Sequence, residues 1–361
     1  MRHHRRVRRE RDTYSEEANP GTLGRVPEEL ASGTALNEDL ILTRPLAEGN
    51  GNVWIAAHKK LGAEVVVKLL PRESITSPEA RIRFTRELRA NAAVDSVHVV
   101  KRLDAGVTED GVPFIALELL VGEDLRTHLG RVGPLSPAAV VRIVKQVASG
   151  LYTVHRAGIV HRDIKPENVF LCTREGEAPL VKVLDFGVAK NIKPKSSIAT
   201  SAGIVVGTPS YMSPEQMTGG VVDEQVDLWA LAVLAFETLT GDRPFPGDDL
   251  AHIGRAALTG PRPTISSIEP AFRGLDSFFQ RAFAKERKDR FASAVAMSEA
   301  FASAVVSLSD PQVPSSAAKR TRSVETFALE VHPQRRVRKM VIVGTLLLIL
   351  GLIFFFIAMR R

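Results

Sequence analysis

The sequence HRDIKPEN at residues 161–168 gathers three chemically different side chains on one short stretch. Asp163 brings a carboxylate, Lys165 brings an ammonium group two residues later, and Asn168 brings a side-chain amide. A second carboxylate, Asp185, opens the triplet DFG further along the chain. Carboxylate and amide oxygens are ligands that Mg²⁺ accepts, and a carboxylate can also take the proton of a hydroxyl group. Together these side chains are the groups that phosphoryl transfer to a hydroxyl requires.

A turn that contains glycine precedes this stretch and lies between two predicted strands. Residues 40–57 contain both strands, and Gly49 and Gly51 lie in the turn between them. Backbone N–H groups approach a phosphate closely only where side chains are absent. The next predicted strand, residues 64–70, contains Lys68 inside an apolar run, where a lysine is costly unless it is paired. This part of the chain therefore has the features of a phosphate-binding region.

The first part of the chain is predicted to be a small lobe of strands with one helix. The helix begins at Ser77 and Pro78, a capping serine followed by proline in the first turn, and continues to about Val94. Strands are predicted at residues 40–46, 53–57, 64–70, 97–101 and 113–119.

The second part of the chain is predicted to be mainly helical. Ser136 opens a helix with apolar residues at spacings of three and four, which ends near Gly158. Asp227 opens a helix that is apolar on all sides, which indicates a buried helix, and Gly241 ends it. Two short strands, at residues 169–171 and 181–184, are expected to hold Asn168 and Asp185.

Taken in order, these motifs resemble those of bacterial Hanks-type (eukaryotic-like) serine/threonine protein kinases over about residues 40–304. The resemblance implies an α+β fold with two lobes. The small β-rich N-lobe would comprise residues 39–120 and the large, mainly α C-lobe residues 121–304. It further implies transfer of the γ-phosphoryl group of ATP to Ser or Thr of protein substrates, with Mg²⁺, or Mn²⁺ in its place, as the metal.

The resemblance gives the catalytic and metal-binding residues specific roles. Asp163 would orient the hydroxyl and accept its proton, and Lys165 would stabilise the transferred phosphate. Asn168 and Asp185 would hold the metal. Lys68 would contact the α- and β-phosphates.

The nucleotide site implied by the resemblance draws on several segments. Glu87 would pair with Lys68, although a surface contact with Arg83 or Asn91 is the alternative. Ala47 stands where the family has a glycine, and the turn is one residue short. Glu118 to Gly122 would form the hinge, whose backbone binds the adenine edge. The full set of implied nucleotide-binding residues is Lys68, Glu87, Ala47, Gly49, Gly51, Val53, Val66, Leu117, Glu118, Leu120 and Asp185.

Further residues acquire expectations from the same resemblance. Asp124 would contact the ribose or only cap the helix that follows it. Thr200 and Ser201 are the candidate phosphorylation sites of an activation loop at residues 188–212, and Thr208 would lie in the substrate pocket. Two structural contacts are also implied: Asp227 bonded to the backbone of the catalytic loop, and Arg290 paired with Glu215.

The net charge of +7 is concentrated outside the predicted kinase domain. Residues 1–11 carry six arginines and one glutamate, and residues 335–339 carry four cations. We expect residues 1–38 to be a disordered basic tail, either solvated or an arm for anionic lipid or an acidic partner. A nucleic-acid-binding domain would place its cations on a folded face, so no specific nucleic acid is expected as a partner.

Residues 340–359 form a run of 20 residues without a charge, rich in Leu, Ile, Val and Phe. At 1.5 Å per residue such a helix is about 30 Å long, the thickness of a bilayer's hydrocarbon core. We therefore expect a C-terminal transmembrane helix, a flexible linker at 305–339 and a stub at 360–361. The cations before the segment predict a single-pass protein of the cell membrane with its kinase domain in the cytoplasm. Homodimers through this helix have weak support, since its glycines do not form GxxxG.

A different function class stays open on the sequence alone. The alanine at position 47 and the shortened turn also fit a membrane-tethered pseudokinase, which would bind ATP as a scaffold with little or no catalysis. Against this alternative, no residue that the chemistry requires is missing.

The single cysteine, Cys172, excludes an intramolecular disulfide and fits a reducing compartment.

Overall fold

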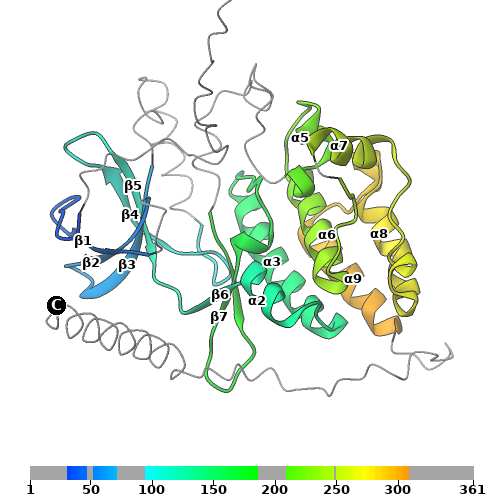
Figure 1. Cartoon of the computed structure of the whole chain (residues 1–361), viewed down its shortest axis with the longest axis horizontal. Helices are drawn as coiled ribbons and strands as arrows, with labels where there is room; N and C mark the ends of the chain where they lie inside the picture. Colours follow the sequence, from blue (N-terminus) through cyan, green and yellow to red (C-terminus); the bar gives the residue numbers. More distant parts are fainter. Residues whose placement is uncertain (1–30, 47–51, 71–93, 186–208, 248, 309–361) are drawn as a thin grey trace, which may run out of the picture. The chain divides into compact units, whose positions relative to one another are not determined.

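The computed structural model describes residues 31–46, 52–70, 94–185, 209–247 and 249–308. Within these ranges the chain forms a five-stranded sheet, a three-stranded sheet and a set of helices (Figure 1). Several predictions fall on other residues and lie outside the described ones: the glycine turn at 47–51, most of the helix at 77–94, the loop at 188–208, the linker at 309–339 and the membrane segment at 340–359.

The N-lobe sheet is antiparallel and has the strand order β1-β2-β3-β5-β4 (blue to cyan in Figure 1). Val65, Val67 and Leu69 of β3 face the core, so Val66 and Lys68 share the opposite face. The strands are β1 (Leu40–Pro45), β2 (Val53–His58), β3 (Ala63–Leu69), β4 (Arg102–Val107) and β5 (Pro113–Glu118).

Residues 31–38, predicted to belong to the disordered tail, instead pack against this sheet. Leu36 is 4% exposed and joins the core cluster of the N-lobe. The N–H of Gly33 donates to the carbonyl of Leu42, and the N–H of Leu42 donates to the carbonyl of Thr34. Residues 31–38 are therefore part of the ordered N-lobe and not of a disordered tail, because backbone pairing and one buried leucine order a segment of polar composition.

The strand predicted at residues 97–101 does not belong to the N-lobe sheet. The strand β4 begins later, at Arg102. Val99 instead forms an isolated parallel bridge with Val183, and the N–H of Val100 donates to the carbonyl of Val183 at 3.0 Å. The valine-rich pattern correctly indicated an extended, half-buried segment, but the backbone of His98 and Val100 bonds Val183 of the C-lobe, and among these described residues only Lys101 bonds β5, at Glu118.

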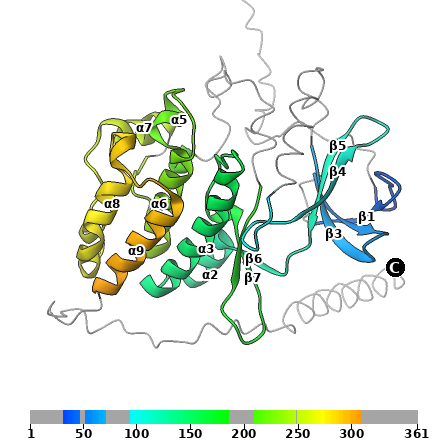
Figure 2. The same cartoon turned by 180° about the vertical axis from the view of Figure 1, so that it is seen from behind.

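The C-lobe is built around helix α6 (Gln225–Thr240), which is buried on all sides as predicted. Gly241 ends this helix in the left-handed conformation (φ 82°), which glycine adopts without steric cost. Helix α3 packs against α9 and α6 (Figure 2). The other helices are α2 (Leu125–Val132), α3 (Pro137–Arg156), α5 (Pro214–Met217), α7 (Leu250–Thr259), α8 (Asp276–Ala282) and α9 (Ala294–Leu308).

A small sheet with the strand order β6-β7-β8 holds the catalytic segments. The predicted hairpin is confirmed: β7 directly follows Asn168, and β8 ends two residues before Asp185. The strands are β6 (Gly122–Asp124), β7 (Val169–Cys172) and β8 (Leu180–Val183). Short 3₁₀ helices include η2 (Pro166–Asn168) and η3 (Pro209–Tyr211).

Among the described residues, no helix combines the length and the apolar character needed to cross a bilayer. The predicted membrane segment at 340–359 lies outside those residues. The last described helix, α9, ends at Leu308, four residues beyond the predicted end of the domain.

Candidate active site

The catalytic-loop side chains converge on the carboxylate of Asp163. The Nζ of Lys165 lies 3.2 Å from Asp163 Oδ2, and both side chains are 20% exposed. Asn168 Nδ2 donates to Asp163 Oδ2 at 3.1 Å and to the Asp163 carbonyl at 2.7 Å. A carboxylate held between an ammonium group and an amide N–H has a fixed position and a compensated charge. Asp163 is thus oriented by the two residues that the sequence placed beside it.

Asp227 of helix α6 holds the backbone that presents Asp163. Its Oδ2 accepts the N–H of His161 at 2.8 Å, and its Oδ1 accepts the N–H of Arg162 at 2.7 Å. Arg162 has a φ of 65°, a left-handed conformation that non-glycine residues rarely adopt. Asp227 itself is fully buried and also bonds His155 Nε2 at 2.8 Å. The predicted bond from Asp227 to the catalytic-loop backbone is confirmed, and it offsets the cost of the strained turn.

Asp185 is joined to the catalytic loop through the residue before it. The N–H of Leu184 donates to the carbonyl of Asn168 at 2.8 Å, and Leu184's own carbonyl lies 2.7 Å from His161 Nε2. Asp185 also has a positive φ, of 54°. The two segments that carry the predicted metal ligands are therefore fixed to each other by one backbone hydrogen bond and one side-chain contact.

Lys68 reaches across from strand β3 to this part of the C-lobe. Its Nζ lies 2.7 Å from Asp185 Oδ2, and the two side chains are 28% and 41% exposed. The sequence argument gave Glu87 as partner because Lys68 otherwise lacked a counter-charge. Glu87 lies outside the described residues, so that pairing stays a prediction, and among the described residues Asp185 is a counter-charge of Lys68. The lysine and the predicted metal ligand thus come together in one ion pair.

The oxygens of Asp185 and Asn168 fit a magnesium ion. Asn168 uses its Nδ2 for Asp163, which leaves its Oδ1 without a hydrogen bond among the described residues. Mg²⁺ in phosphoryl-transfer sites takes one or two protein oxygens and completes its shell with phosphates and water. No group of three or more His, Cys, Asp or Glu side chains within the described ranges could hold a metal ion by itself. A metal here would therefore need the phosphates of a nucleotide as further ligands.

The protein kinase domain family matches residues 44–302 of this chain. This chain belongs to the protein kinase family.

Two curated relatives come from Myxococcus xanthus. Serine/threonine-protein kinase Pkn1 is 41% identical over 261 residues, which are 72% of this chain and 37% of that protein. Serine/threonine-protein kinase pkn3 is 39% identical over 253 residues, which are 69% of this chain and 46% of that protein. The chain thus matches less than half the length of these relatives. Among solved structures, the kinase domain of Mycobacterium tuberculosis PknI aligns with a TM-score of 0.60 at 27% identity, covering 76% of this chain and 99% of that one.

The hinge of the kinase domain follows strand β5. The cross-strand register pairs Val66 with Leu117 and Val53 with Lys68, so residues predicted around the nucleotide are neighbours in the sheet. The backbone N–H of Leu120 makes no hydrogen bond within the described part of the chain, as expected of a group that would bind adenine.

Asp124, for which two roles were open, caps helix α2. Its Oδ1 accepts the N–H of Thr127 at 2.9 Å, and its Oδ2 accepts the Thr127 hydroxyl at 2.7 Å. Both carboxylate oxygens are thus engaged by the first turn of the helix. The capping role explains this residue without a ribose contact.

Arg290 and Glu215 form the predicted structural ion pair of the kinase C-lobe. Two parallel contacts, of 2.8 and 3.1 Å, join the guanidinium to the carboxylate. The side chains are only 2% and 8% exposed, and the guanidinium also stacks over Trp229 at 4.9 Å from the ring centroid. The pair fastens the end of the activation segment to the helices below it.

Sequence reasoning missed a polar network under the same segment. Arg126 of α2 bonds Glu167 of the catalytic loop at 3.0 Å and Glu237 of α6 at 3.0 Å. The Tyr211 hydroxyl donates to Glu237, and Arg243 stacks over the Tyr211 ring. The one available signal was Glu237, a carboxylate inside the apolar helix sequence, which is costly to bury without partners.

Sequence reasoning also missed the buried ion pair of Lys182. This buried lysine of β8 pairs with the hinge residue Glu118 at 2.6 Å. The argument that flagged Lys68, a charge inside an apolar β-branched run, applies equally to Lys182 in the sequence VKVL. Applied consistently, it would have predicted a second buried pair.

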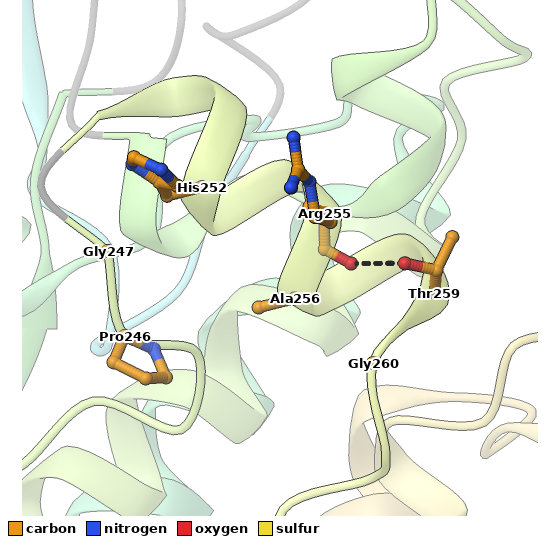
Figure 3. Close-up of a pocket in the computed structure, with 7 residues that line it drawn as sticks. All are labelled: Pro246, Gly247, His252, Arg255, Ala256, Thr259 and Gly260. Carbon is orange, nitrogen blue, oxygen red and sulfur yellow. Dashed lines mark hydrogen bonds between the residues drawn. The ribbon is translucent and has the colours of Figure 1, made fainter.

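The remaining predicted residues lie outside the described part of the chain: Ala47, Gly49, Gly51, Glu87, Thr200, Ser201 and Thr208. A separate hollow of about 690 Å³ lies on helix α7. Figure 3 shows its lining, where the Thr259 hydroxyl donates to the Arg255 carbonyl at 2.9 Å. None of the predicted site residues lines it: the lining residues are Pro246, Gly247, His252, Arg255, Ala256, Thr259 and Gly260.

Proposed function

We propose that this protein is a serine/threonine protein kinase that transfers the γ-phosphoryl group of ATP to protein hydroxyls. One observation carries the proposal. The Asp163 carboxylate is held between Lys165 and Asn168, and the carbonyl of Asn168 ties this loop to the segment of Asp185. The names of the curated relatives support Ser and Thr as acceptors.

Mg-ATP, when bound, would supply the phosphoryl group. The charges of its phosphates and metal would hold the nucleotide to the protein. Asp163 orients the acceptor hydroxyl and accepts its proton, which contributes about 10²–10⁴-fold in rate for a well-placed base. Lys165, 3.2 Å from that carboxylate, compensates negative charge on the transferred group. Asn168 and Asp185 would offer oxygens to the metal, and Lys68 would exchange Asp185 for phosphate oxygens.

Transfer of ³²P from labelled ATP tests this proposal. We expect the purified full chain to label itself or a generic basic protein, and the Asp163→Asn variant to lose nearly all of that signal. Equal labelling by both proteins would reject the kinase assignment. Binding of ATP by the wild type without any transfer would support the pseudokinase alternative.

We further propose that residues 340–359 anchor the kinase in the cell membrane with its catalytic domain in the cytoplasm. The support is the run of 20 uncharged residues and the four cations just before it. The full chain should resist carbonate extraction from membranes, and a Leu347→Arg, Leu350→Arg variant should be extracted. Protease added to intact spheroplasts should leave the kinase domain uncut. Digestion from outside would reverse the orientation.

Autophosphorylation at Thr200 or Ser201 is part of the same proposal. Arg162 precedes the catalytic aspartate and would offer a cation to a phosphate on this loop. Mass spectrometry of the wild type should find phosphate there, and Thr200→Ala with Ser201→Ala should lower activity. Full activity in a wild type without loop phosphate would reject this control. Dependence of the labelling rate on protein concentration would test whether two copies act on each other.

A further inference from the structure

Lys182 is a buried cation that the proposed chemistry does not use. It lies on β8 and is only 9% exposed. Its Nζ is 2.6 Å from Glu118 Oε1 and 3.4 Å from the carbonyl of Val99. Among the described residues, Lys182 thus connects three segments that are distant in sequence: its own strand β8, the residue Glu118 and the residue Val99.

Glu118 is the residue at which these segments meet. Its Oε1 also accepts the N–H of Lys101 at 2.7 Å, and its own N–H donates to the Lys101 carbonyl at 3.0 Å. The segment 98–101 in turn is bonded to β8, because the N–H of Val183 donates to the carbonyl of His98 at 2.9 Å. We call Lys182, Glu118 and residues 98–101 the hinge clasp.

The hinge clasp lies between the two ends of the proposed nucleotide site. Glu118 is two residues before Leu120, whose N–H would bind adenine in the proposed site. Lys182 is three residues before Asp185, the proposed metal ligand. A rigid link between these two positions therefore sets the distance between the base-binding backbone and the metal-binding carboxylate.

We propose that Lys182 is a positioning residue for ATP, acting through Glu118 to hold the hinge in register with Asp185. The inference rests on the proposed kinase function and names a determinant of nucleotide affinity within it. A well-packed apolar pair of similar volume would serve stability as well as or better than a buried ion pair. The short contact between Lys182 and Glu118 instead fixes the hinge and Asp185 at one separation. A ligand that spans both positions needs that separation to be constant.

Steady-state kinetics of the full chain test the proposal. Lys182→Met keeps the volume and removes the charge, so KM for ATP should rise about three- to thirtyfold, as when a coupled contact next to a ligand is lost. The kcat at saturating ATP should change less than twofold, because no group at the reacting atoms is altered. Glu118→Gln should shift KM in the same direction, and the double variant should be no worse than the worse single one.

Matched variants separate positioning from folding. Lys145→Met makes the same chemical change on an exposed lysine of helix α3, outside the hinge clasp, and should leave KM unchanged. Lys182→Arg keeps the charge and should retain most of the affinity. Calorimetry with a non-hydrolysable ATP analogue and thermal melting should show weaker binding in Lys182→Met at temperatures where it is folded.

The outcomes also separate this proposal from the kinase assignment. A wild type that neither binds the analogue nor transfers phosphate would reject the assignment itself. An active wild type with a Lys182→Met variant of unchanged KM and analogue affinity, even with a lower melting temperature, would reject only the clasp. If Lys182→Met does not fold, Glu118→Gln decides, because that side chain is 27% exposed and its loss leaves a smaller defect.

Discussion

Two motif-encoded ion pairs of this kinase domain differ sharply in their surroundings. Lys68 and Asp185 meet across the two lobes with 28% and 41% of their side chains exposed. Arg290 and Glu215 are 2% and 8% exposed and make two parallel contacts. The first pair has one contact and lies among groups that would bind a nucleotide. The second pair is buried and is held by two contacts.

The difference indicates which pair can change partners. An exposed pair gains little from its own attraction, since water screens both charges. Lys68 and Asp185 can therefore release each other at low cost when phosphates and a metal arrive. A buried pair has lost its water, so removal of either partner leaves an uncompensated charge. We call Lys68–Asp185 the open pair, which is suited to exchanging partners during catalysis. We call Arg290–Glu215 the closed pair, which is suited to stabilising the fold.

The largest effect expected from this comparison is on stability at the closed pair. Arg290→Met leaves Glu215 buried without its cation and should lower the free energy of unfolding by about 3–5 kcal/mol. Urea denaturation of the full chain, followed by fluorescence of the tryptophan that Arg290 covers, measures it.

An exposed pair provides the control for that measurement. Arg44 and Glu64 are 3.7 Å apart with side chains 59% and 49% exposed. Glu64→Gln should change the unfolding free energy by at most about 1 kcal/mol. Similar losses in both variants would show that burial does not separate the two kinds of pair.

The next largest effect is on catalysis at the open pair. Asp185→Asn should lower kcat by about 10²–10³-fold, the usual cost of removing a preorganised charged group. Asparagine tolerates the positive φ of 54° at this position, so the fold should persist. The melting temperature should stay close to that of the wild type while ³²P transfer collapses. An Asp185→Asn protein that melts far below the wild type would place this pair with the structural ones.

The Tyr211 network extends the comparison to a mixed case with an intermediate effect. Burial raises the pKa of Tyr211 above its ordinary value, and the hydrogen bond to Glu237 raises that pKa further. Tyr211→Phe should cost about 1.5–3 kcal/mol, as for a hydrogen bond to a charged group. Tyr152→Phe, which removes an exposed hydroxyl, is the matched control.

The same network predicts an alkaline limit of stability. An unfolded tyrosine titrates near a pKa of about 10. Because the folded pKa is higher, Tyr211 keeps its proton in the folded state when the unfolded chain loses it. Its contribution is complete below that pH and is lost as the pH rises further. The wild type should therefore lose stability more steeply above about pH 10 than Tyr211→Phe; parallel curves would contradict this.

The features that the sequence predicted correctly depend on short-range patterns. The loop at 161–168 and the hairpin behind it needed only local spacing, and the all-apolar helix α6 indicated its own burial. Asp227 and the Arg290 pair came through the family resemblance. In each case the residue type and its neighbours carry most of the information, because local geometry or complete burial dictates them.

The errors concern partners from distant parts of the chain. A valine-rich run at 97–101 predicts extended backbone, but the strand that pairs with it cannot be read from the run itself. Lys182 and Glu118 are 64 residues apart. Residues 31–38 were assigned to the tail because of their polar composition, but backbone pairing and the buried Leu36 dock them on the sheet. The pairing of Glu87 with Lys68 stays a prediction, because Glu87 lies outside the described residues.

The smallest expected effect concerns Asp124. This carboxylate is close in sequence to the proposed nucleotide site, but in the structure it bonds the first turn of helix α2. Asp124→Ala removes an N-cap and should lower the unfolding free energy by about 1 kcal/mol. Since both oxygens bond Thr127, the KM for ATP should not change. A severalfold rise in KM with unchanged stability would mean that this carboxylate leaves the helix for the ribose. Asp124 would then resemble Asp185, an acid whose resting partner yields to the nucleotide, and exposure alone would not decide which pairs can exchange.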